Sequence, residues 1–404
     1  MKRSESLLPV AMVGIGGYGT GLLRTLIEGG AGHGLRVVAA VDPMPERAPM
    51  TMAMLADAGV PCYAKCEDIP AAPAVQLAVI ASPIPVHASQ TCLLLSRGIH
   101  VLCEKPAAAT LEDGLAMAKA ARAAGRQCAI GFQWSFASST RRLKMALASG
   151  SLGAPRSISV MTLWPRGRGY YARNGWAGRR YDAAGRAVFD DPVMNATSHF
   201  LHHSLFILGE APTVSAWPVS VEAELYRARP IETFDAAALR LRTAGGVTIR
   251  FLTAHCCRDI LGPLFSIHCD EADIEYNWER GTGPGFIVHR PDGSQEILGQ
   301  PEAESQEKLW RTVAAVRAGT PVDCPVEAAL PHLAVAQALR QLPVQEIPPS
   351  VCTEYGEAEA AVPVPEGLDE VFIRAHKNGL LPHEAGGATW TVPAVAAPDV
   401  AGVP

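Results

Sequence analysis

A glycine-rich run near the amino terminus constrains the fold of this chain more than any other feature. Gly14, Gly16 and Gly19 form the pattern Gly-x-Gly-x-x-Gly at the end of a short apolar segment. In this pattern the first glycine permits a tight turn, the second lets the backbone approach a pyrophosphate, and the third allows close helix–strand packing. The helix that follows offers free N–H groups to the phosphates. The run therefore predicts a dinucleotide-binding turn, made of Gly14, Ile15, Gly16, Gly17, Tyr18 and Gly19.

The context of this turn is an alternation of two kinds of segment over about the first 130 residues. Short runs that are apolar throughout are typical of parallel strands buried on both faces. Between them lie segments with apolar residues at helical spacing, so the pattern predicts a doubly wound parallel sheet, the Rossmann arrangement. The expected strands are Pro9–Gly14, Leu35–Val41, Leu77–Ser82, His100–Cys103 and Gln127–Gly131, and the expected helices are Gly19–Glu28, Glu46–Ala58, Val86–Ser96 and Leu111–Ala124.

An acidic residue follows the second expected strand. Asp42 lies 23 residues beyond Gly19. A carboxylate at this place accepts hydrogen bonds from the adenosine ribose, and its charge repels a 2′-phosphate. We therefore predict NAD as the cofactor in preference to NADP, although Arg47 could rescue some NADP binding. A tight turn without a nucleotide is the alternative, and the strand, the glycines and the acid together disfavour it.

The pattern changes after about residue 132. Strand-like runs between residues 214 and 297 are separated by short turns such as Ala244–Gly246 and Pro291–Gly293, which predicts antiparallel hairpins. Helical spacing occurs at Ser138–Ala148, Pro192–Leu208, Ala303–Ala318 and Val326–Leu342. We thus expect an α/β chain with a Rossmann domain at 1–131, an α+β domain at 132–384 with a large, mostly antiparallel open sheet and helices on one face, and a loose Ala/Pro/Val-rich tail at 385–404.

One group of residues suited to proton transfer follows the strand His100–Cys103. Glu104, Lys105 and Pro106 come directly after it. Ligands of open α/β sheets bind at the carboxyl ends of strands, so Lys105 is expected at the cofactor edge. Pro106 stops the strand and biases Lys105 to an extended backbone. A lysine in a surface loop is the alternative.

A second group lies in the helical segment Pro192–Leu208. Asn195 and His199 are four residues apart, which on a helix puts them on one face, and a histidine can relay a proton near neutral pH. His199 and His203 have the spacing of two metal ligands, but a His-Glu-x-x-His motif is missing. We therefore predict no metal and a catalytic His199, with histidines of a core or an interface as the alternative.

Composition excludes several classes of partner. The net charge of −5 argues against nucleic acid and anionic membranes. No apolar run reaches about 18 residues, so no membrane span is expected. The first apolar run leads straight into the glycine turn without a cleavage site, which indicates a strand rather than a signal peptide. Ten scattered cysteines with no Cys-x-x-Cys pair fit reduced, buried thiols, so we expect a cytoplasmic protein.

Together these landmarks resemble the Gfo/Idh/MocA oxidoreductases. The resemblance rests on the glycine run, Asp42, the segment Ser82–His87, the tripeptide Glu104–Pro106 and a helix that ends in Leu208-Gly209. It implies that Lys105 and His199 are the active-site lysine and the catalytic histidine. It also implies an open sheet that forms a homo-dimer or homo-tetramer. Expected cofactor contacts beyond the glycine turn come from Asp42, Ser82, Pro83, His87, Glu104 and Lys105.

The chain departs from the family pattern at two positions. The family usually has an aspartate four residues before its histidine, where this chain has Asn195, and another common aspartate is replaced by His202. An amide can orient His199 or bind a substrate hydroxyl, but it cannot act as a carboxylate base. The proton route is then expected to rest on Lys105 and His199. A base lysine needs a lowered pKa, for which burial beside the positive ring of the cofactor is a cause.

The segment Trp164–Asp191 carries six arginines and several aromatic residues. Guanidinium groups bind carboxylates and phosphates, and aromatic faces stack on sugar rings. We expect a carbohydrate-like substrate held by Arg173, Trp176, Arg179 and His202, and a salt-bridged surface loop is the alternative.

The function expected from these features is an NAD-dependent dehydrogenase of a sugar, cyclitol or sugar-acid-like hydroxyl compound. Two alternatives stay open. One is a redox-neutral enzyme that oxidises a sugar transiently, eliminates or hydrolyses, and reduces again with the same NAD. The other is a non-catalytic NAD(H)-binding protein, which only Asn195 favours.

Overall fold

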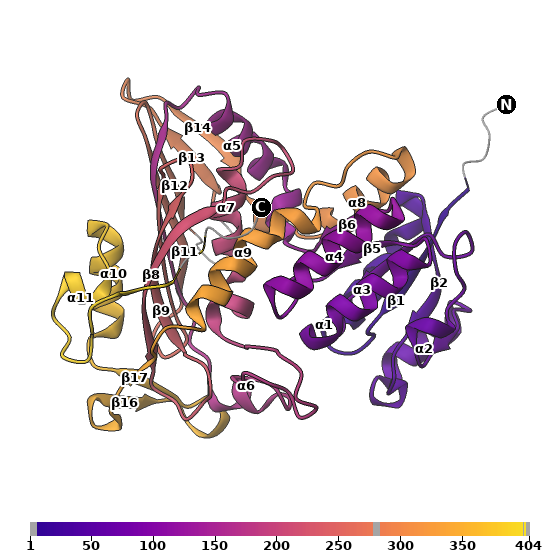
Figure 1. Ribbon diagram of the computed structural model, residues 1–404, viewed down its shortest axis with the longest axis horizontal. Coiled ribbons are helices and arrows are strands. Elements are labelled where there is room, and N and C mark those ends of the chain that lie inside the picture. The colour runs from indigo at the N-terminus through magenta and orange to yellow at the C-terminus, as the bar shows by residue number, and fades with distance from the viewer. Residues whose placement is uncertain (1–5, 278–282, 399, 401–404) are drawn as a thin grey trace. The chain divides into compact units, whose positions relative to one another are not determined.

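The computed structural model describes residues 6–277, 283–398 and 400 (Figure 1). The chain divides into two compact units. The first consists of residues 1–136 and 305–330, and the second of residues 137–304 and 331–404. The division differs from the expected domains, because the helix α8 (Glu307–Ala318) and the start of α9 (Val326–Leu339) group with the first unit.

The first unit contains the predicted Rossmann sheet. Its six strands are all parallel and lie in the order β3-β2-β1-β4-β5-β6. Strands β1, β4 and β6 are buried along their whole length, as expected for a sheet covered on both faces. The sheet comprises β1 (Leu8–Val13), β2 (Leu35–Val41), β3 (Cys62–Tyr63), β4 (Leu77–Ile80), β5 (His100–Cys103) and β6 (Cys128–Ile130), and its helices are α1 (Tyr18–Gly29), α2 (Pro49–Asp57), α3 (His87–Ser96) and α4 (Leu111–Ala124).

Local chemistry explains the ends of these helices. Thr110 precedes α4, and its hydroxyl oxygen accepts a hydrogen bond from the backbone N–H of Asp113 at 3.1 Å. Gly125 ends the same helix in the left-handed conformation with φ 59°. Both signals are readable in the sequence, and the predicted bounds of α4 are confirmed.

The second unit is built on a sheet of ten strands. Its strands follow the order β14-β13-β12-β11-β7-β10-β9-β8-β15, and β18 pairs with β8. The pairs β7–β10 and β8–β15 are parallel and the others are antiparallel, so the prediction of a mostly antiparallel sheet is confirmed. The strands are β7 (Pro155–Leu163), β8 (Pro218–Arg227), β9 (Ala236–Thr243), β10 (Thr248–Ala254), β11 (Leu261–Cys269), β12 (Asp273–Asn277), β13 (Phe286–His289), β14 (Gln295–Gly299), β15 (Gln345–Glu346) and β18 (Val395–Ala396).

Helices cover both faces of this sheet, so the expectation of helices on one face is wrong. Figure 1 shows α5 (Ser138–Ala148) and α7 (Ser198–Ile207) on one side, and α10 (Leu368–Asn378) and α11 (Pro382–Ala385) on the other. Leu368 and Phe372 of α10 pack in one buried cluster with Met161 of β7 and Leu252 of β10. Close to this helix the two-stranded sheet of β16 (Cys352–Tyr355) and β17 (Val362–Pro365) forms a separate element.

Part of the segment expected as a loose tail is held against the second unit. Trp390 is buried, its indole N–H donates to the carbonyl oxygen of Glu366 at 2.9 Å, and its ring meets Tyr226 edge-on. Beyond it β18 pairs with β8. The composition of residues 385–404 lacks periodicity, but one tryptophan and one edge strand hold residues 390–396 against the sheet. Residues 399 and 401–404 of the predicted tail lie outside the described residues.

None of the helices in the described part of the chain is long and apolar enough to cross a bilayer.

Candidate active site

The glycine turn after β1 is shaped as the sequence predicts. Gly14 has φ 85°, and a Cβ there would lie 2.8 Å from the backbone of Ala81. A Cβ on Gly19 would lie 2.0 Å from the carbonyl oxygen of Gly14, so close strand–helix packing requires glycine at both positions. A Cβ on Gly16 or on Gly17 would meet no atom within 4 Å, so these two residues leave the start of α1 open. This open cradle fits a dinucleotide pyrophosphate.

Asp42 stands at the end of β2 and is tied to the same turn. One carboxylate oxygen accepts the backbone N–H of Ile15 at 3.1 Å, and the other accepts that of Met44 at 2.9 Å. These bonds hold the negative charge beside the glycine turn, where an adenosine ribose would lie. Asp42 therefore fits the predicted preference for NAD.

Replacing Asp42 by Asn should shift the nucleotide preference. The variant keeps the shape of the side chain but removes the charge that repels a 2′-phosphate. We expect the ratio of NADPH to NADH affinity to rise roughly tenfold, about 1.4 kcal/mol. Fluorescence titration with both nucleotides measures the two dissociation constants, and Asp57→Asn at an exposed helix end is the control. An unchanged ratio would show that Asp42 does not face the ribose.

His87, a predicted cofactor contact, joins two loops. Its Nε2 lies 2.8 Å from the carbonyl oxygen of Ser82 and its Nδ1 lies 2.9 Å from that of Pro106. The ring is buried, and burial lowers its pKa although both carbonyls oppose this. Both ring nitrogens are thus used inside the protein. His87 positions the loop after β4, which carries Ser82 and Pro83, relative to the loop after β5, which carries Lys105.

Glu104 is held by a residue that sequence reasoning missed. Its side chain is 7% exposed, and the ammonium nitrogen of Lys308 lies 2.5 Å from its carboxylate. Lys308 is fully buried on α8 and also donates to the hydroxyl of Tyr18 at 2.8 Å. Burial lowers the pKa of Lys308, but Glu104 and Tyr18 more than offset this and raise it. The available signal was a lysine among the buried positions Leu309 and Thr312 of a helix.

This ion pair fixes the start of the candidate catalytic loop. Lys105 follows Glu104 directly, is half-buried, and its peptide bond to Pro106 is cis. A Cβ at Gly131 would lie 2.8 Å from the Glu104 carboxylate, so the neighbouring loop leaves room for that group only because the residue is glycine. The first unit thus brings together the glycine turn, Asp42, Glu104 and Lys105 at the carboxyl ends of its strands.

Replacing Lys308 by Met should leave Glu104 as an uncompensated buried charge. We expect a loss of about 3–5 kcal/mol of unfolding free energy, because breaking a buried pair is more costly than removing both partners. The double variant Lys308→Met/Glu104→Gln should regain most of it. Urea denaturation measures the effect, with exposed Lys119→Met on α4 as the control. Equal stability of Lys308→Met and the control would contradict this assignment.

In the second unit the expected helix Pro192–Leu208 is interrupted. Pro192–Ala196 forms a π-helical turn, Thr197 has φ −110° and ψ 9°, and α7 begins at Ser198. Asp191 caps the first turn by accepting the backbone N–H of Met194 at 2.8 Å. Burial raises the pKa of Asp191 to about 7. Asn195 and His199 therefore lie on consecutive turns of different geometry, and both are half-buried.

Position 195 carries no carboxylate, but its side chain is hydrogen-bonded to the carboxylate of Asp190. The Asn195 amide nitrogen donates to Asp190 Oδ1 at 2.7 Å. Asp190 is buried, and its Oδ2 accepts the backbone N–H of Gly178 at 2.9 Å and a guanidinium N–H of Arg173 at 3.0 Å. The sequence signal was the acidic pair directly before Pro192, and it was not singled out.

Two further histidines of α7 belong to the core. His202 is 1% exposed and stacks on Phe206, and His203 is fully buried and stacks on Phe286. Burial lowers the pKa of both rings, that of His203 to about 3. The substrate contact of His202 stays a prediction. Among the described residues no group of three or more His, Cys, Asp or Glu side chains could hold a metal ion.

The arginine-rich segment is partly engaged within the protein. Arg173 pairs with Asp190 and lies over the rings of Tyr170 and Trp176, at 3.7 and 5.2 Å from their centroids. Arg168 and Arg186 form exposed ion pairs with Glu354 and Asp182. The salt-bridged alternative therefore holds for these arginines. Arg179 is exposed and, within the described residues, has no ion pair.

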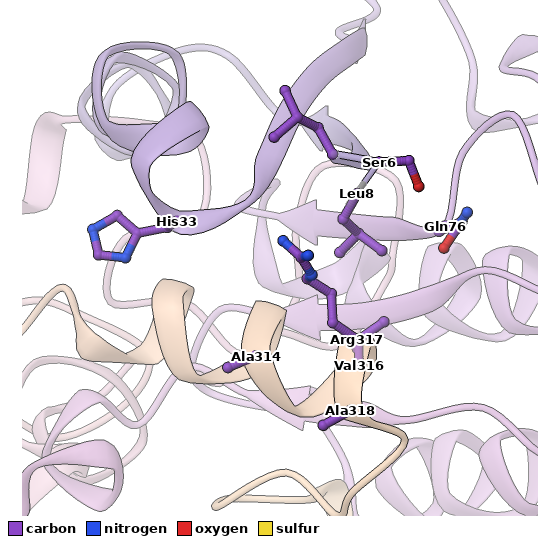
Figure 2. Close-up of a pocket in the computed structure, with 9 residues that line it drawn as sticks. Ser6, Leu8, His33, Gln76, Ala314, Val316, Arg317 and Ala318 are labelled. Atoms are coloured by element: carbon purple, nitrogen blue, oxygen red, sulfur yellow. The ribbon is translucent and has the colours of Figure 1, made fainter. Parts of the chain in front are cut away.

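A cavity in the first unit lies away from these groups. It has a volume of about 670 Å³ and is lined by Leu8, Gln76, His33 and residues of α8 near Arg317 (Figure 2). Leu8, Gln76 and His33 lie at or just before the amino ends of β1, β4 and β2. Because cofactors of parallel sheets bind at the carboxyl ends of strands, this cavity is not the predicted site.

Comparison with known proteins agrees with the geometry. A family model described as an oxidoreductase family with an NAD-binding Rossmann fold matches residues 8–132, and a GFO/IDH/MocA C-terminal domain model matches residues 140–275. Inositol 2-dehydrogenase of Streptomyces avermitilis is 36% identical over 152 residues, 37% of this chain and 43% of that protein. 1,5-Anhydro-D-fructose reductase of Ensifer adhaerens is 32% identical over 246 residues, 60% of this chain and 67% of that protein.

Solved structures share the fold. The WlbA dehydrogenase of Bordetella pertussis, described in complex with NADH and UDP-GlcNAcA, superposes with a TM-score of 0.67 at 21% identity and covers 83% of this chain and 96% of its own. Aldose-aldose oxidoreductase of Caulobacter crescentus gives 0.65 at 21% identity, with 83% and 97% covered. With the family models and the curated relatives, the chain belongs to the Gfo/Idh/MocA oxidoreductase family, and residues 8–132 are its NAD-binding Rossmann domain.

Proposed function

We propose that this protein is an NAD-dependent dehydrogenase that removes hydride from a hydroxyl carbon of a sugar, cyclitol or sugar-acid-like substrate. Lys105 and His199 transfer the hydroxyl proton and position the substrate, and Asn195 assists them. When bound, NAD accepts the hydride. The residues of this chain bind the nucleotide, orient the substrate hydroxyl and remove its proton.

The observation that carries the proposal is the chain of contacts from Glu104 through Lys308 to Tyr18. Tyr18 opens α1 at the glycine turn, and Glu104 immediately precedes Lys105. A buried ion pair and a hydrogen bond thus link the loop of the candidate base to the turn that receives the phosphates. Such a link holds a reacting group at a set distance from its cofactor, which is a large part of catalysis.

The proton chemistry follows from the residue types. Lys105 must lose its proton to act as a base, and a bound cofactor with a positive nicotinamide ring would favour the neutral amine. His199 carries an imidazole suited to passing the proton on at neutral pH. Asn195 carries no charge and contributes hydrogen bonds alone.

The substrate class rests on the segment Trp164–Asp191 and on the relatives. Trp176 offers an aromatic face and Arg179 an exposed guanidinium, and both are suited to a polyol with an anionic group. Arg173 is engaged by Asp190 and would add a hydrogen bond only with its remaining N–H groups. The curated relatives are named for inositol and for 1,5-anhydro-D-fructose, which are polyhydroxylated rings.

We also propose a cytoplasmic homo-dimer or homo-tetramer. All ten cysteines are free thiols, which fits a reducing compartment. Assembly would use the large sheet of the second unit. Because α10 covers β7 and β10, the part of that face left for a partner is β11 to β14. It carries exposed polar residues such as His268, Asp273 and Glu275.

A nucleotide-reduction screen tests the function. Purified protein is incubated with NAD, and separately with NADP, across sugars, sugar acids, cyclitols and polyols, and absorbance of the reduced nucleotide is followed. We expect net NADH formation with at least one polyhydroxylated ring. In Lys105→Ala the rate should fall at least about a hundredfold, because a positioned acid–base group contributes on the order of 10²–10⁴. NADH affinity is measured beside the rate, because Lys105 is also an expected cofactor contact.

The other outcomes separate the alternatives. Tightly bound NAD with sugar conversion but no net reduction would support the redox-neutral enzyme. Nucleotide binding without any sugar conversion would support the non-catalytic protein. A Lys105→Ala rate equal to that of the unmodified protein would remove Lys105 from the mechanism.

A further inference from the structure

The orientation of the Asn195 side-chain amide is determined by its neighbours. A side-chain amide offers donors on one side and an acceptor on the other. Asp190 Oδ1 lies 2.7 Å from the Asn195 amide nitrogen. A carboxylate only accepts hydrogen bonds, so the opposite amide orientation would set two oxygens against each other. The nitrogen therefore faces Asp190, and the amide oxygen is turned to the other side.

Asp190 itself is fixed on its remaining side. Its Oδ2 accepts from the backbone of Gly178 and from Arg173. Its own backbone is held as well, because its N–H donates to the carbonyl of Arg179 at 3.0 Å and its carbonyl accepts the hydroxyl of Thr233 at 2.8 Å. The buried carboxylate thus has three donors in set directions and cannot turn without losing them.

We propose that Asp190 is a positioning residue that fixes Asn195 as a hydrogen-bond acceptor in the reaction. The role rests on the proposed function, because it assigns Asn195 a task in the candidate active site. Position 195 then offers an uncharged acceptor oxygen, which suits a donor such as the hydroxyl of a polyol substrate. The negative charge stays one hydrogen bond away, buried and neutralised by Arg173.

The same contact explains why an amide stands at this position. An aspartate at 195 would place a second carboxylate within hydrogen-bond distance of Asp190, and two carboxylates so close cannot both be ionised. The pair would share a proton. The charged and titratable groups that face this place are Arg173 and Tyr170 beside Asp190, and Asp191 with Arg340 near it. Arg173 pairs with Asp190, whereas Arg340 lowers the pKa of Asp191 without offsetting the effect of its burial.

An exchange of the two side chains tests the proposal sharply. In Asp190→Asn/Asn195→Asp, the oxygen of the new amide at 190 can still accept from Gly178 and Arg173, and its nitrogen can donate to the new carboxylate at 195. Only the direction of one hydrogen bond is reversed, and net charge and composition stay the same. The two single variants each break that bond. Asp190→Asn sets two amide nitrogens against each other, and Asn195→Asp sets two carboxylates against each other.

The first readout is stability against pH, which needs no substrate. In Asn195→Asp the shared proton raises one folded-state pKa above its unfolded value of about 4. The folded protein then binds a proton that the unfolded chain has lost, so stability relative to the unmodified protein should fall as pH rises from about 4 to 8. The exchange variant should follow the unmodified protein to within experimental error. Exposed Asp259→Asn is the control.

The second readout is turnover with the substrate found in the screen. Asp190→Asn should turn the Asn195 amide over and lower kcat/KM about 10- to 100-fold, the effect of one unmade buried hydrogen bond. NADH affinity should stay within about threefold. The exchange variant should recover to within about fivefold of the unmodified enzyme, far above the product of the two single effects.

The outcomes are decisive in both arms. The proposal is overturned if the stability of Asn195→Asp follows the same pH profile as the control. It is also overturned if the exchange variant is no better than the product of the single variants. If the unmodified protein converts no substrate, the proposed function fails. The stability arm still decides whether Asp190 sets the polarity of Asn195.

Discussion

The buried ion pair between Lys308 and Glu104 is the interaction on which the arrangement of the first unit depends. Lys308 lies on a helix that the chain forms after completing most of the second unit, yet it is enclosed against the Rossmann sheet. Two buried charges cost several kcal/mol each to desolvate and are tolerated only when paired and hydrogen-bonded. Here the pair binds the loop of Lys105 to the tyrosine that opens the glycine turn. The first unit is therefore complete only when residues 305–330 are packed against residues 1–136.

The second unit also contains a buried carboxylate that is paired and hydrogen-bonded. The buried carboxylate of Asp190 pairs through one oxygen with the partly exposed Arg173, and the Asn195 amide donates to its other oxygen. The neighbouring histidines of α7 are also buried, and burial lowers the pKa of both His202 and His203. Asp190 is thus a buried carboxylate beside position 195 whose charge a guanidinium offsets.

Much of the fold was predictable because its signals are local. Hydrophobic period, glycine spacing and Thr110 as a cap locate the strands and helices of the first unit to within one or two residues at most ends. The glycine turn, Asp42 and Lys105 were found in the same way, since each follows a strand directly. What failed depends on contacts distant in sequence. The pairing of Lys308 with Glu104 and the docking of Trp390 leave no periodic trace near those residues. The apolar spacing in α10 indicates an amphipathic helix but does not say which face of the sheet it covers. The break at Thr197 was missed because helical spacing alone does not distinguish a π-helical turn from an α-helix.

The central claim is that the first unit binds NAD at the turn around Gly16. A Cβ at Gly16 would meet no protein atom within 4 Å, so Gly16→Val fits the folded chain but fills the space that a pyrophosphate needs. Equilibrium titration of NADH fluorescence with the unmodified protein and with Gly16→Val tests this directly. We predict saturable binding by the unmodified protein and at least a tenfold weaker affinity in the variant, with thermal stability preserved. Equal affinity of the two proteins for NADH, or no binding by either, would contradict the account.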